Sequence, residues 1–215
     1  MKNLFDRETD SIIFDLDGTL WDATVSCLMA WNKSFEQCGY NNTIERKLII
    51  KISGSPLDIV LSEYFTFIEK KDYEKLVELK KKNEPIFIKN IGGRLYPNVR
   101  NTIKKLAEYK KLFIVSNYLK GYIEYFIENK KLDKIIIGYK SFGETGMKKD
   151  ENIKTIIDEF KLNSPIYVGD TKWDYEASMK NNITFVYAKY GFGKIHDAMY
   201  EIENIKELQK ILNIK

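Results

Sequence analysis

The sequence predicts an α/β protein, with a Rossmann-like parallel sheet core and a small all-helical cap inserted after the first strand. Short runs of β-branched and aromatic residues, bounded by Gly, Asn, Asp or Ser, recur along the chain and are typical of strands buried in a parallel sheet. From about residue 95 onward, segments with helical periodicity alternate with these runs, which indicates βαβ units. The expected strands cover residues 11–14, 112–115, 135–137, 166–168 and 184–187.

Helices are expected between and after the later strands. Asn98 is a candidate N-cap for a helix over 99–109, whose apolar residues fall on one face. The same periodicity predicts a helix over 153–160. Apolar residues recur at every third position from 199 to 211, so a last amphipathic helix is expected there.

The stretch from residue 21 to residue 91 breaks this alternation. It contains segments with helical periodicity but no convincing strand, and Gly92-Gly93 supplies a flexible return to the sheet. We therefore expect a core made of residues 1–20 and 92–215 and a helical cap over residues 21–91. The alternative is that these helices belong to one single domain. The helical segments cover residues 25–35, 57–65 and 73–82.

Composition limits the classes of function. The chain has 215 residues, of which 44% are hydrophobic and 31% are charged, and this excludes wholesale disorder. The formal net charge of +4 is too small to indicate a nucleic-acid partner or an anionic membrane surface. Clusters of lysines alternate with acidic residues on predicted helices, so we interpret them as solvated helix faces. These clusters are Lys70-Lys71, Lys80-Lys81-Lys82, Lys104-Lys105 and Lys130-Lys131.

The few cysteines and the start of the chain predict a cytoplasmic location. Cys27 and Cys38, with the single histidine His196, form neither a disulfide framework nor a zinc site. The first residues turn acidic before an apolar run could form, so no signal peptide is expected. No apolar run approaches the roughly 18 residues of a membrane span.

Polar and acidic residues follow three of the expected strands. They are Asp15-Leu16-Asp17-Gly18-Thr19-Leu20, Ser116-Asn117, and Gly169-Asp170-Thr171-Lys172-Trp173-Asp174. Open α/β sheets bind their ligands at the carboxyl ends of the strands. Carboxylates gathered at one sheet edge repel one another, and a divalent cation removes that cost. An all-oxygen ligand set selects Mg²⁺ rather than Zn²⁺.

Each of these segments also has a purely structural interpretation. Asp-x-Asp-Gly is a common turn sequence, Ser116-Asn117 alone is a helix cap, and Gly169-Asp170 is a frequent loop start. A lysine in the run Met147-Lys148-Lys149-Asp150 is by itself most often solvated. Their occurrence in this order, each after its own strand, favours a functional site.

Together these residues resemble the haloacid dehalogenase superfamily in its phosphatase branch. The matching segments span residues 12 to 174, and Lys148 remains a rival to Lys149 for the third motif. The insertion after Asp17 and the run Tyr190-Gly191-Phe192-Gly193 are similar to the phosphoglycolate phosphatase-like subgroup with its helical cap. The four motifs are Asp15–Leu20, Ser116, Lys149 with Asp150-Glu151-Asn152-Ile153, and Val168–Asp174.

The resemblance implies a Mg²⁺-dependent phosphatase that works through an aspartyl-phosphate. Asp15 would be the nucleophile, and Asp17 would act as general acid and then as general base. Ser116 and Asn117 would bind the phosphoryl oxygens, and Lys149 would neutralise the nucleophile and the transferring group. The residues implied for Mg²⁺ are Asp15, Asp17 through its backbone carbonyl, Asp170, and Asp174 in a supporting place.

A small cap implies a small phosphorylated metabolite as partner, because a polymer could not be enclosed. A phosphoglycolate-like compound, a sugar phosphate and a nucleotide all fit this expectation. Lys51 and Ser53-Gly54-Ser55 are candidate selectivity residues, although a plain turn between helices explains them equally well. The sequence makes no prediction about oligomeric state.

Three other functions stay open at this stage. A phosphomutase of the same superfamily carries almost the same motifs. A haloacid dehalogenase shares the nucleophile, but Asp17 and the Gly169–Asp174 segment argue against it. A non-catalytic phosphate-sensing module would keep its aspartyl-phosphate, and the retained Asp17 argues against that because a general base destroys such a signal.

Overall fold

A computed structural model describes residues 9–196 and 198–214. The chain divides into two compact units, and each is described by itself. Unit 1 comprises Met1–Trp21 and Leu95–Lys215, and unit 2 comprises Asp22–Arg94. The boundary falls in two short paired strands, β2 (Trp21–Asp22) and β3 (Arg94–Leu95).

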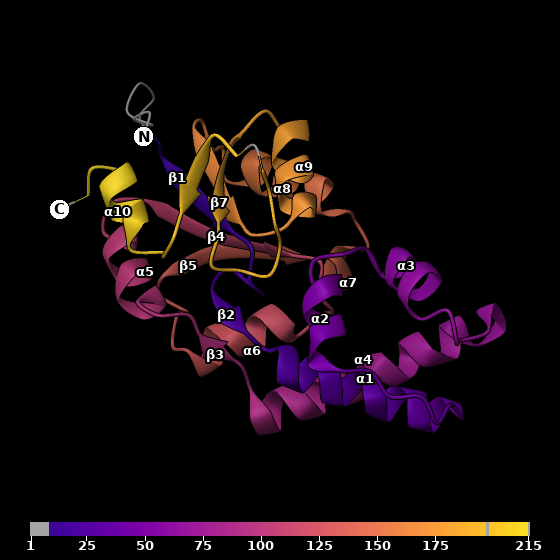
Figure 1. Cartoon of the computed structure of the whole chain (residues 1–215). Helices are drawn as coiled ribbons and strands as arrows, with labels where there is room; N and C mark the ends of the chain where they lie inside the picture. Colours follow the sequence, from indigo (N-terminus) through magenta and orange to yellow (C-terminus); the bar gives the residue numbers. More distant parts are fainter. Residues whose placement is uncertain (1–8, 197, 215) are drawn as a thin grey trace. The chain divides into compact units, whose positions relative to one another are not determined.

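Within the described residues, unit 1 contains a six-stranded sheet in which every strand pairing is parallel (Figure 1). This confirms the predicted α/β class and all five expected strands. β1 lies in the interior of the sheet between β4 and β6, so its four residues are buried. In spatial order the strands are β5 (Ile136–Ser141), β4 (Lys111–Ser116), β1 (Ser11–Phe14), β6 (Pro165–Gly169), β7 (Thr184–Ala188) and β8 (Tyr200–Ile202).

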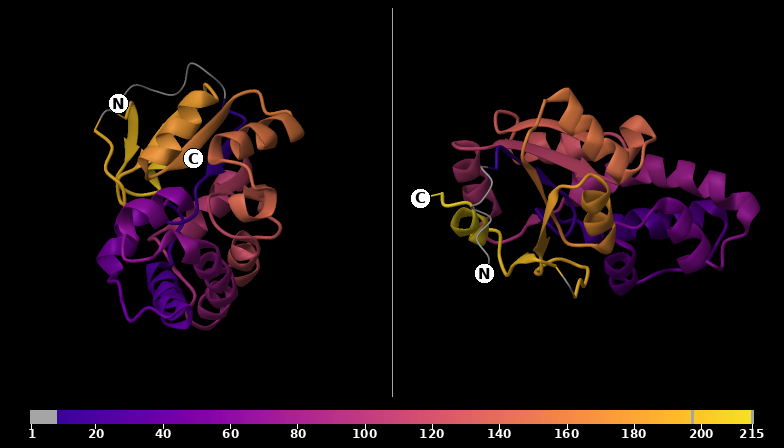
Figure 2. Two further views of the ribbon diagram at one scale, coloured as in Figure 1. Left: turned by 90° about the vertical axis from the view of Figure 1, so that its right-hand side faces the viewer. Right: turned by 90° about the horizontal axis from the view of Figure 1, so that it is seen from above.

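Helices cover the sheet of unit 1 (Figure 2). α8 (Lys149–Glu159) and α9 (Lys172–Lys180) pack on one face, where alternate strand residues such as Ile13, Phe113 and Tyr167 form a buried cluster. This alternation follows from the two-residue period of a strand. The remaining helices of the unit are α5 (Val99–Ala107), α6 (Tyr122–Asn129), α7 (Phe142–Thr145) and α10 (Glu207–Ile211).

Unit 2 is helical in its described residues, apart from the strand residues at its two ends. Its core contains Trp31, Phe35 and Phe65, whose rings pack at centroid distances of 4.8–5.8 Å. Because α1 and α4 carry long apolar stripes, they form the body of this unit. Its helices are α1 (Thr24–Cys38), α2 (Arg46–Ile52), α3 (Leu57–Ile59), the π-helical turn η2 (Val60–Tyr64), the 3₁₀ turn η3 (Lys70–Asp72) and α4 (Tyr73–Ile91).

The prediction of one last helix over 199–211 is wrong. Residues Tyr200–Ile202 instead form β8, which pairs in parallel with β7 at the edge of the sheet, and only Glu207–Ile211 is helical. Backbone hydrogen bonding to an open sheet edge outweighs the local helical pattern. Asn98 does precede α5, but its side chain makes no capping hydrogen bond.

The interpretation of every lysine cluster as a solvated face is wrong for Lys80. This residue is 5% exposed and forms an ion pair with Glu84 on the same helix. Its neighbours Lys81 and Lys82 are exposed. None of the helices in the described part of the chain is long and apolar enough to span a membrane.

Candidate active site

The carboxyl ends of three adjacent strands bring the predicted site residues to one edge of the sheet. Asp15 directly follows β1, Ser116 is the last residue of β4, and Asp170 directly follows β6. Since β4 and β6 flank β1 in parallel register, the segments after them meet at this edge. The structure therefore brings together residues that are up to 155 positions apart in the chain, Asp15 and Asp170.

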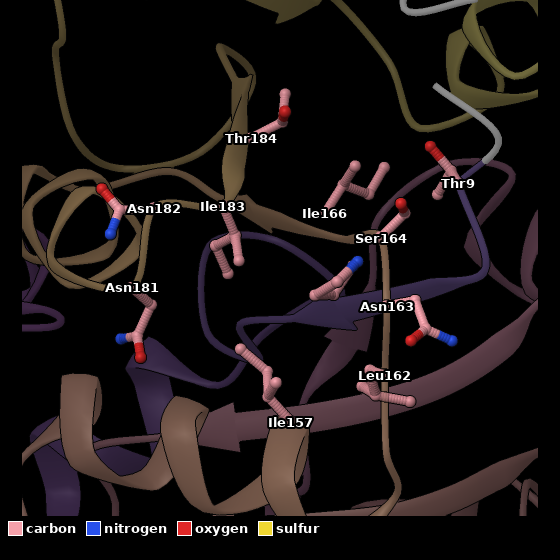
Figure 3. A pocket seen from close by; sticks show the side chains of 11 residues that line it. Thr9, Ile157, Leu162, Asn163, Ser164, Ile166, Asn181, Asn182, Ile183 and Thr184 are labelled. Carbon is pink, nitrogen blue, oxygen red and sulfur yellow. The ribbon is translucent and has the colours of Figure 1, made fainter.

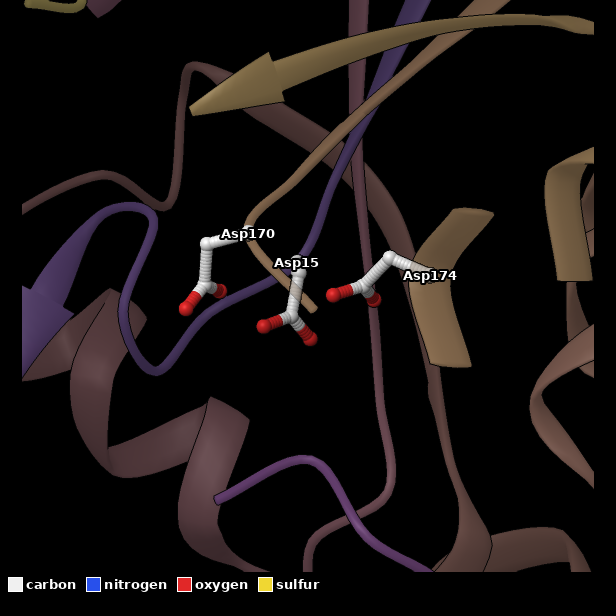
Figure 4. Close-up of side chains that lie close together, drawn as sticks. All are labelled: Asp15, Asp170 and Asp174. Carbon is white, nitrogen blue, oxygen red and sulfur yellow. The ribbon is translucent and has the colours of Figure 1, made fainter. Parts of the chain in front are cut away.

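Three buried carboxylates converge at this edge (Figure 4). One oxygen from each of Asp15, Asp170 and Asp174 lies within 4.8 Å of the others. All three side chains are almost fully buried, at 3%, 0% and 0% exposure. Three oxygen donors at this spacing suit a hard divalent cation such as Mg²⁺. The carboxyl group of Asp17 is not part of this group of three.

Lys149 is the cation that the protein itself supplies to these carboxylates. Its Nζ lies 2.8 Å from Asp15 Oδ1 and 2.6 Å from Asp174 Oδ1. Lys149 is buried at the first turn of α8, whereas Lys148 is exposed. The geometry thus favours Lys149 over its rival. When all three carboxyl groups are ionised, one lysine leaves an excess of negative charge in the site.

Asp174 is held by donors on both oxygens. Its Oδ1 accepts from Lys149 and from the Tyr167 hydroxyl at 3.1 Å, and its Oδ2 accepts from the backbone N–H and hydroxyl of Thr171 at 2.9 Å and 2.7 Å. The Thr171 contacts form the N-terminal capping box of α9. Asp174 therefore anchors Lys149 to the start of a helix.

Asp170 is held by the loop after β7. Its Oδ2 accepts from the backbone N–H groups of Phe192 and Gly193 at 2.7 Å and 3.4 Å, and its Oδ1 accepts from the Thr19 hydroxyl at 3.2 Å. This loop approaches so closely that a Cβ on Gly191 would lie 2.3 Å from Asp170 Cβ. The glycine-rich run after the last predicted strand is thus explained by contact with the acidic site.

Burial and mutual repulsion perturb the ionisation of these groups. Burial, together with the nearby Asp174 carboxylate, raises the pKa of Asp15 to about 7, even though Lys149 opposes the shift. The same causes raise the pKa of Asp170 well above its ordinary value. Burial alone would lower the pKa of Lys149, but Asp15 and Asp174 raise it, so the ammonium stays charged. The carboxylates would ionise more easily beside a divalent cation.

Asp17 lies in a tight loop that follows β1. The backbone N–H of Gly18 donates to Trp21 O at 2.9 Å, and those of Leu20 and Trp21 donate to Leu16 O. Gly18 has a φ of +87°, and a Cβ on it would lie 2.3 Å from Asp170 Oδ2. Only glycine fits both the positive φ and the space beside Asp170.

The remaining predicted residues differ in their surroundings. Ser116 is 2% exposed at the end of β4, and Asn117 follows it in a half-buried position. In unit 2, the Lys51 ammonium lies over the ring of Tyr64, and the Ser53 hydroxyl donates to Ile49 O. These contacts lie within unit 2 and do not distinguish a selectivity role from a plain turn between helices.

Two residues at the site were not singled out by the sequence. The hydroxyl of Tyr122 donates to Asp17 Oδ1 at 2.7 Å, and that of Tyr167 contacts Asp174. Tyr167 lies in the apolar run that predicts a strand, where its aromatic ring is counted among the apolar residues. Tyr167 stands two residues before Gly169 on a strand that is buried on both faces. A buried tyrosine hydroxyl needs a hydrogen-bond partner, so this position could have indicated a contact with the site.

A separate pocket of about 210 Å³ lies at the other end of the strands (Figure 3). It is lined by residues at the amino ends of β6 and β7, among them Asn163, Ser164, Asn182 and Thr184. The carboxylates lie at the carboxyl ends, so this pocket is not part of the candidate site.

Comparison with known proteins agrees with this geometry. The model of the haloacid dehalogenase-like hydrolase family matches residues 12–188. A phosphoglycolate phosphatase from Aquifex aeolicus (strain VF5) is 26% identical over 216 residues, covering 94% of this chain and 96% of the relative.

Solved structures share the fold. A haloacid dehalogenase-like family hydrolase from Streptococcus pneumoniae has a TM-score of 0.82 at 21% identity, covering 94% of this chain and 98% of that one. A protein from Haemophilus somnus 129pt, described as a predicted phosphoglycolate phosphatase, has a TM-score of 0.82 at 18% identity and covers 95% and 98%. The family match spans most of the chain and all four motifs. The chain therefore belongs to the haloacid dehalogenase-like hydrolases, as the resemblance of its motifs to their phosphatase branch predicts.

Proposed function

We propose that this enzyme is a Mg²⁺-dependent phosphatase that hydrolyses a small phosphomonoester through a phosphorylated Asp15. The observation that carries the proposal is the buried Asp15 carboxylate, which is paired with Lys149 beside Asp170 and Asp174. A buried nucleophile next to a fixed cation suits the transfer of an anionic phosphoryl group, and the surrounding carboxylates suit a divalent cation that would neutralise that group.

In the first step, a carboxylate oxygen of Asp15 attacks phosphorus and the bond to the ester oxygen breaks. Asp17 gives its proton to the departing oxygen. Lys149 neutralises charge on Asp15 and on the transferring group, and the Ser116 hydroxyl, with Asn117 beside it, donates to phosphoryl oxygens.

In the second step, Asp17 takes a proton from water, which attacks phosphorus while the bond to Asp15 breaks and inorganic phosphate leaves. Asp15 and Asp170, with the backbone carbonyl of Asp17, would hold Mg²⁺, while Asp174 would support the site by holding Lys149. When bound, the ion neutralises the negative charge that accumulates on the phosphoryl oxygens.

We further propose that unit 2 acts as the cap that restricts the enzyme to small substrates. The Aquifex aeolicus relative is named a phosphoglycolate phosphatase, so 2-phosphoglycolate is the first substrate to test. Sugar phosphates and nucleoside monophosphates complete the panel, because the acidic site itself recognises only the phosphate ester.

Steady-state hydrolysis of p-nitrophenyl phosphate tests this function, with Mg²⁺ and with a chelator, for the wild type, Asp15→Asn and Asp17→Asn. We expect turnover that needs Mg²⁺ and falls by at least about 10⁴-fold in Asp15→Asn. Asp133→Asn is a matched control, because Asp133 is exposed. Turnover that survives chelation or persists in Asp15→Asn would contradict the proposal. Transfer of the phosphoryl group to a second position of a sugar phosphate, without release of phosphate, would indicate a mutase instead.

A further inference from the structure

Asp17 has a buried partner that none of the sequence motifs contains. The hydroxyl of Tyr122, in the first turn of α6, donates to Asp17 Oδ1 at 2.7 Å. The two residues are 105 positions apart, and both belong to unit 1. Tyr122 is 4% exposed and Asp17 is half-buried, so this hydrogen bond is partly buried.

The Tyr122 ring is fixed by two other aromatic rings. Tyr118 stacks on it with centroids 3.8 Å apart and an interplanar angle of 15°. Trp21 contacts it edge to face at 5.4 Å. Tyr118 follows the Ser116-Asn117 segment and Trp21 closes the Asp17 loop, so the ring joins two segments of the site. A ring held on two sides presents its hydroxyl in one direction.

The Asp17 backbone is fixed independently by the hydrogen bonds of its loop, which leaves only the side-chain torsions to be set. The hydrogen bond that the Tyr122 hydroxyl donates to Oδ1 restricts those torsions, because the Tyr122 ring is itself fixed. Because Oδ1 accepts the Tyr122 hydrogen, the other oxygen, Oδ2, becomes the one that carries a proton to or from a reacting group.

We propose that Tyr122 is a positioning residue that orients the Asp17 carboxyl group for proton exchange with the leaving oxygen and with water. This inference rests on the proposed function, in which Asp17 is the general acid and base. Tyr122 keeps its own proton throughout; only the Oδ2 proton of Asp17 moves. Misorientation of a proton donor lowers the rate without changing substrate binding.

The test compares Tyr122→Phe with the wild type on two esters, an alkyl phosphate and p-nitrophenyl phosphate. An alkoxide needs a proton as it leaves and nitrophenolate hardly does, so loss of Asp17 orientation affects the alkyl ester more. We expect kcat/KM to fall by about 30-fold for the alkyl ester and by about threefold for the aryl ester. The inhibition constant of inorganic phosphate should stay within about twofold, because Tyr122 donates to Asp17, which moves protons and is not among the residues proposed to bind the phosphoryl oxygens.

Two further variants separate positioning from a structural role. Tyr125→Phe removes a hydroxyl from the same helix, and we expect wild-type kinetics because no hydrogen bond of that hydroxyl is present among the described residues. In an Asp17→Asn background, Tyr122→Phe should cause no further loss of kcat/KM, because there is no acid left to orient.

An equal loss on both esters, or a weaker inhibition by phosphate, would overturn the proposal in favour of a structural role. A gain in rate in Tyr122→Phe would also overturn it, because Tyr122 would then hold the Asp17 carboxyl group in an orientation that is unproductive for proton exchange. In both cases wild-type turnover and its loss in Asp17→Asn would leave the proposed function standing. A wild-type chain without phosphatase activity would contradict the proposed function and this inference together.

Discussion

In the described residues, each of the two units contains one buried lysine that forms an ion pair with carboxylate groups, and the two sites differ in charge balance. In unit 1, Lys149 contacts Asp15 and Asp174, which come from distant segments, with Asp170 close by. In unit 2, Lys80 pairs with Glu84 one helical turn away, and its ammonium lies 4.9 Å from the Trp31 ring centroid.

The difference separates a functional site from a structural pair. Lys80 and Glu84 form a one-to-one ion pair whose charges neutralise each other. Around Lys149, three carboxyl groups lie near one ammonium at the carboxyl ends of the strands. When they are ionised, an additional cation lowers the electrostatic energy of that arrangement. Excess charge, rather than burial of a lysine, distinguishes the candidate active site.

Among the variants that compare the two buried lysines, Lys149→Met is expected to have the largest effect. It removes the charge that stabilises both Asp15 and the transferring phosphoryl group, so kcat should fall by about 10³-fold. Steady-state hydrolysis at saturating Mg²⁺ measures this, and Lys148→Met is the matched control because Lys148 is exposed. Activity close to that of the wild type in both variants would contradict a role of Lys149 in the reaction.

Lys80→Met should instead reduce stability. It leaves the Glu84 carboxylate buried without its ion-pair partner, which costs about 3–5 kcal/mol of unfolding free energy. The double variant Lys80→Met/Glu84→Leu should recover most of this loss, since an apolar pair of similar volume packs well. Urea unfolding measures both, and kcat per folded molecule should stay unchanged. A fall in kcat in the double variant would contradict the claim that the Lys80–Glu84 pair has only a structural role.

Two glycines sharpen the same comparison. Gly18→Ala places a Cβ against Asp170 and should lower kcat by about 10²-fold. Gly39 also has a positive φ, at the end of α1, but a Cβ there meets nothing within 4 Å. Gly39→Ala should therefore cost only about 1 kcal/mol of stability and leave activity intact. Kinetics with thermal unfolding distinguishes the two outcomes, and intact activity in Gly18→Ala would contradict the close packing at Asp170.

The excess charge in unit 1 predicts that Mg²⁺ and protons compete. The pKa of Asp15 is about 7 in the folded chain and 3.8 ordinarily, so the metal-free folded protein binds a proton that the unfolded chain releases. The contribution of Asp15 to the free energy of unfolding therefore decreases as the pH rises from about 4 to about 7.

Mg²⁺ displaces that proton, so its affinity should rise by about tenfold per pH unit or more up to about pH 7, because the raised pKa of Asp170 adds a second competing proton. Calorimetric titration with Mg²⁺ at several pH values measures this. In Asp15→Asn the pH dependence should become weaker, and the part that comes from Asp170 should remain. An affinity that is the same at pH 5 and pH 8 would contradict the account.

The sequence predicts five of the six sheet strands described in unit 1, together with its acidic residues, because both depend on local patterns. Asp15 and Asp170 directly follow short apolar runs, and the topology of a parallel sheet brings such positions together. The choice of Lys149 over Lys148 needed the structure, since the two are adjacent and only the rotation of α8 decides which is buried.

Contacts between distant segments could not be read from the sequence. Tyr122 reaches Asp17 because α6 and the Asp17 loop pack together, and nothing near either residue marks this contact. Lys80 lies in a run of three lysines whose composition predicts a solvated face, yet its position on α4 directs it to the buried side. At Tyr200–Ile202, pairing with β7 replaced an expected helix.

The central claim, that Asp15 carries the phosphoryl group, is tested most directly by trapping. Asp17→Asn is mixed with ³²P-labelled p-nitrophenyl phosphate, whose leaving group hardly needs a proton, and with Mg²⁺; the sample is then quenched in acid and digested for mass analysis. Because this variant lacks the base that activates water, we expect the label to accumulate on the peptide that contains Asp15. Rapid turnover by the wild type, with no label on Asp15 at any time in either protein, would contradict the account.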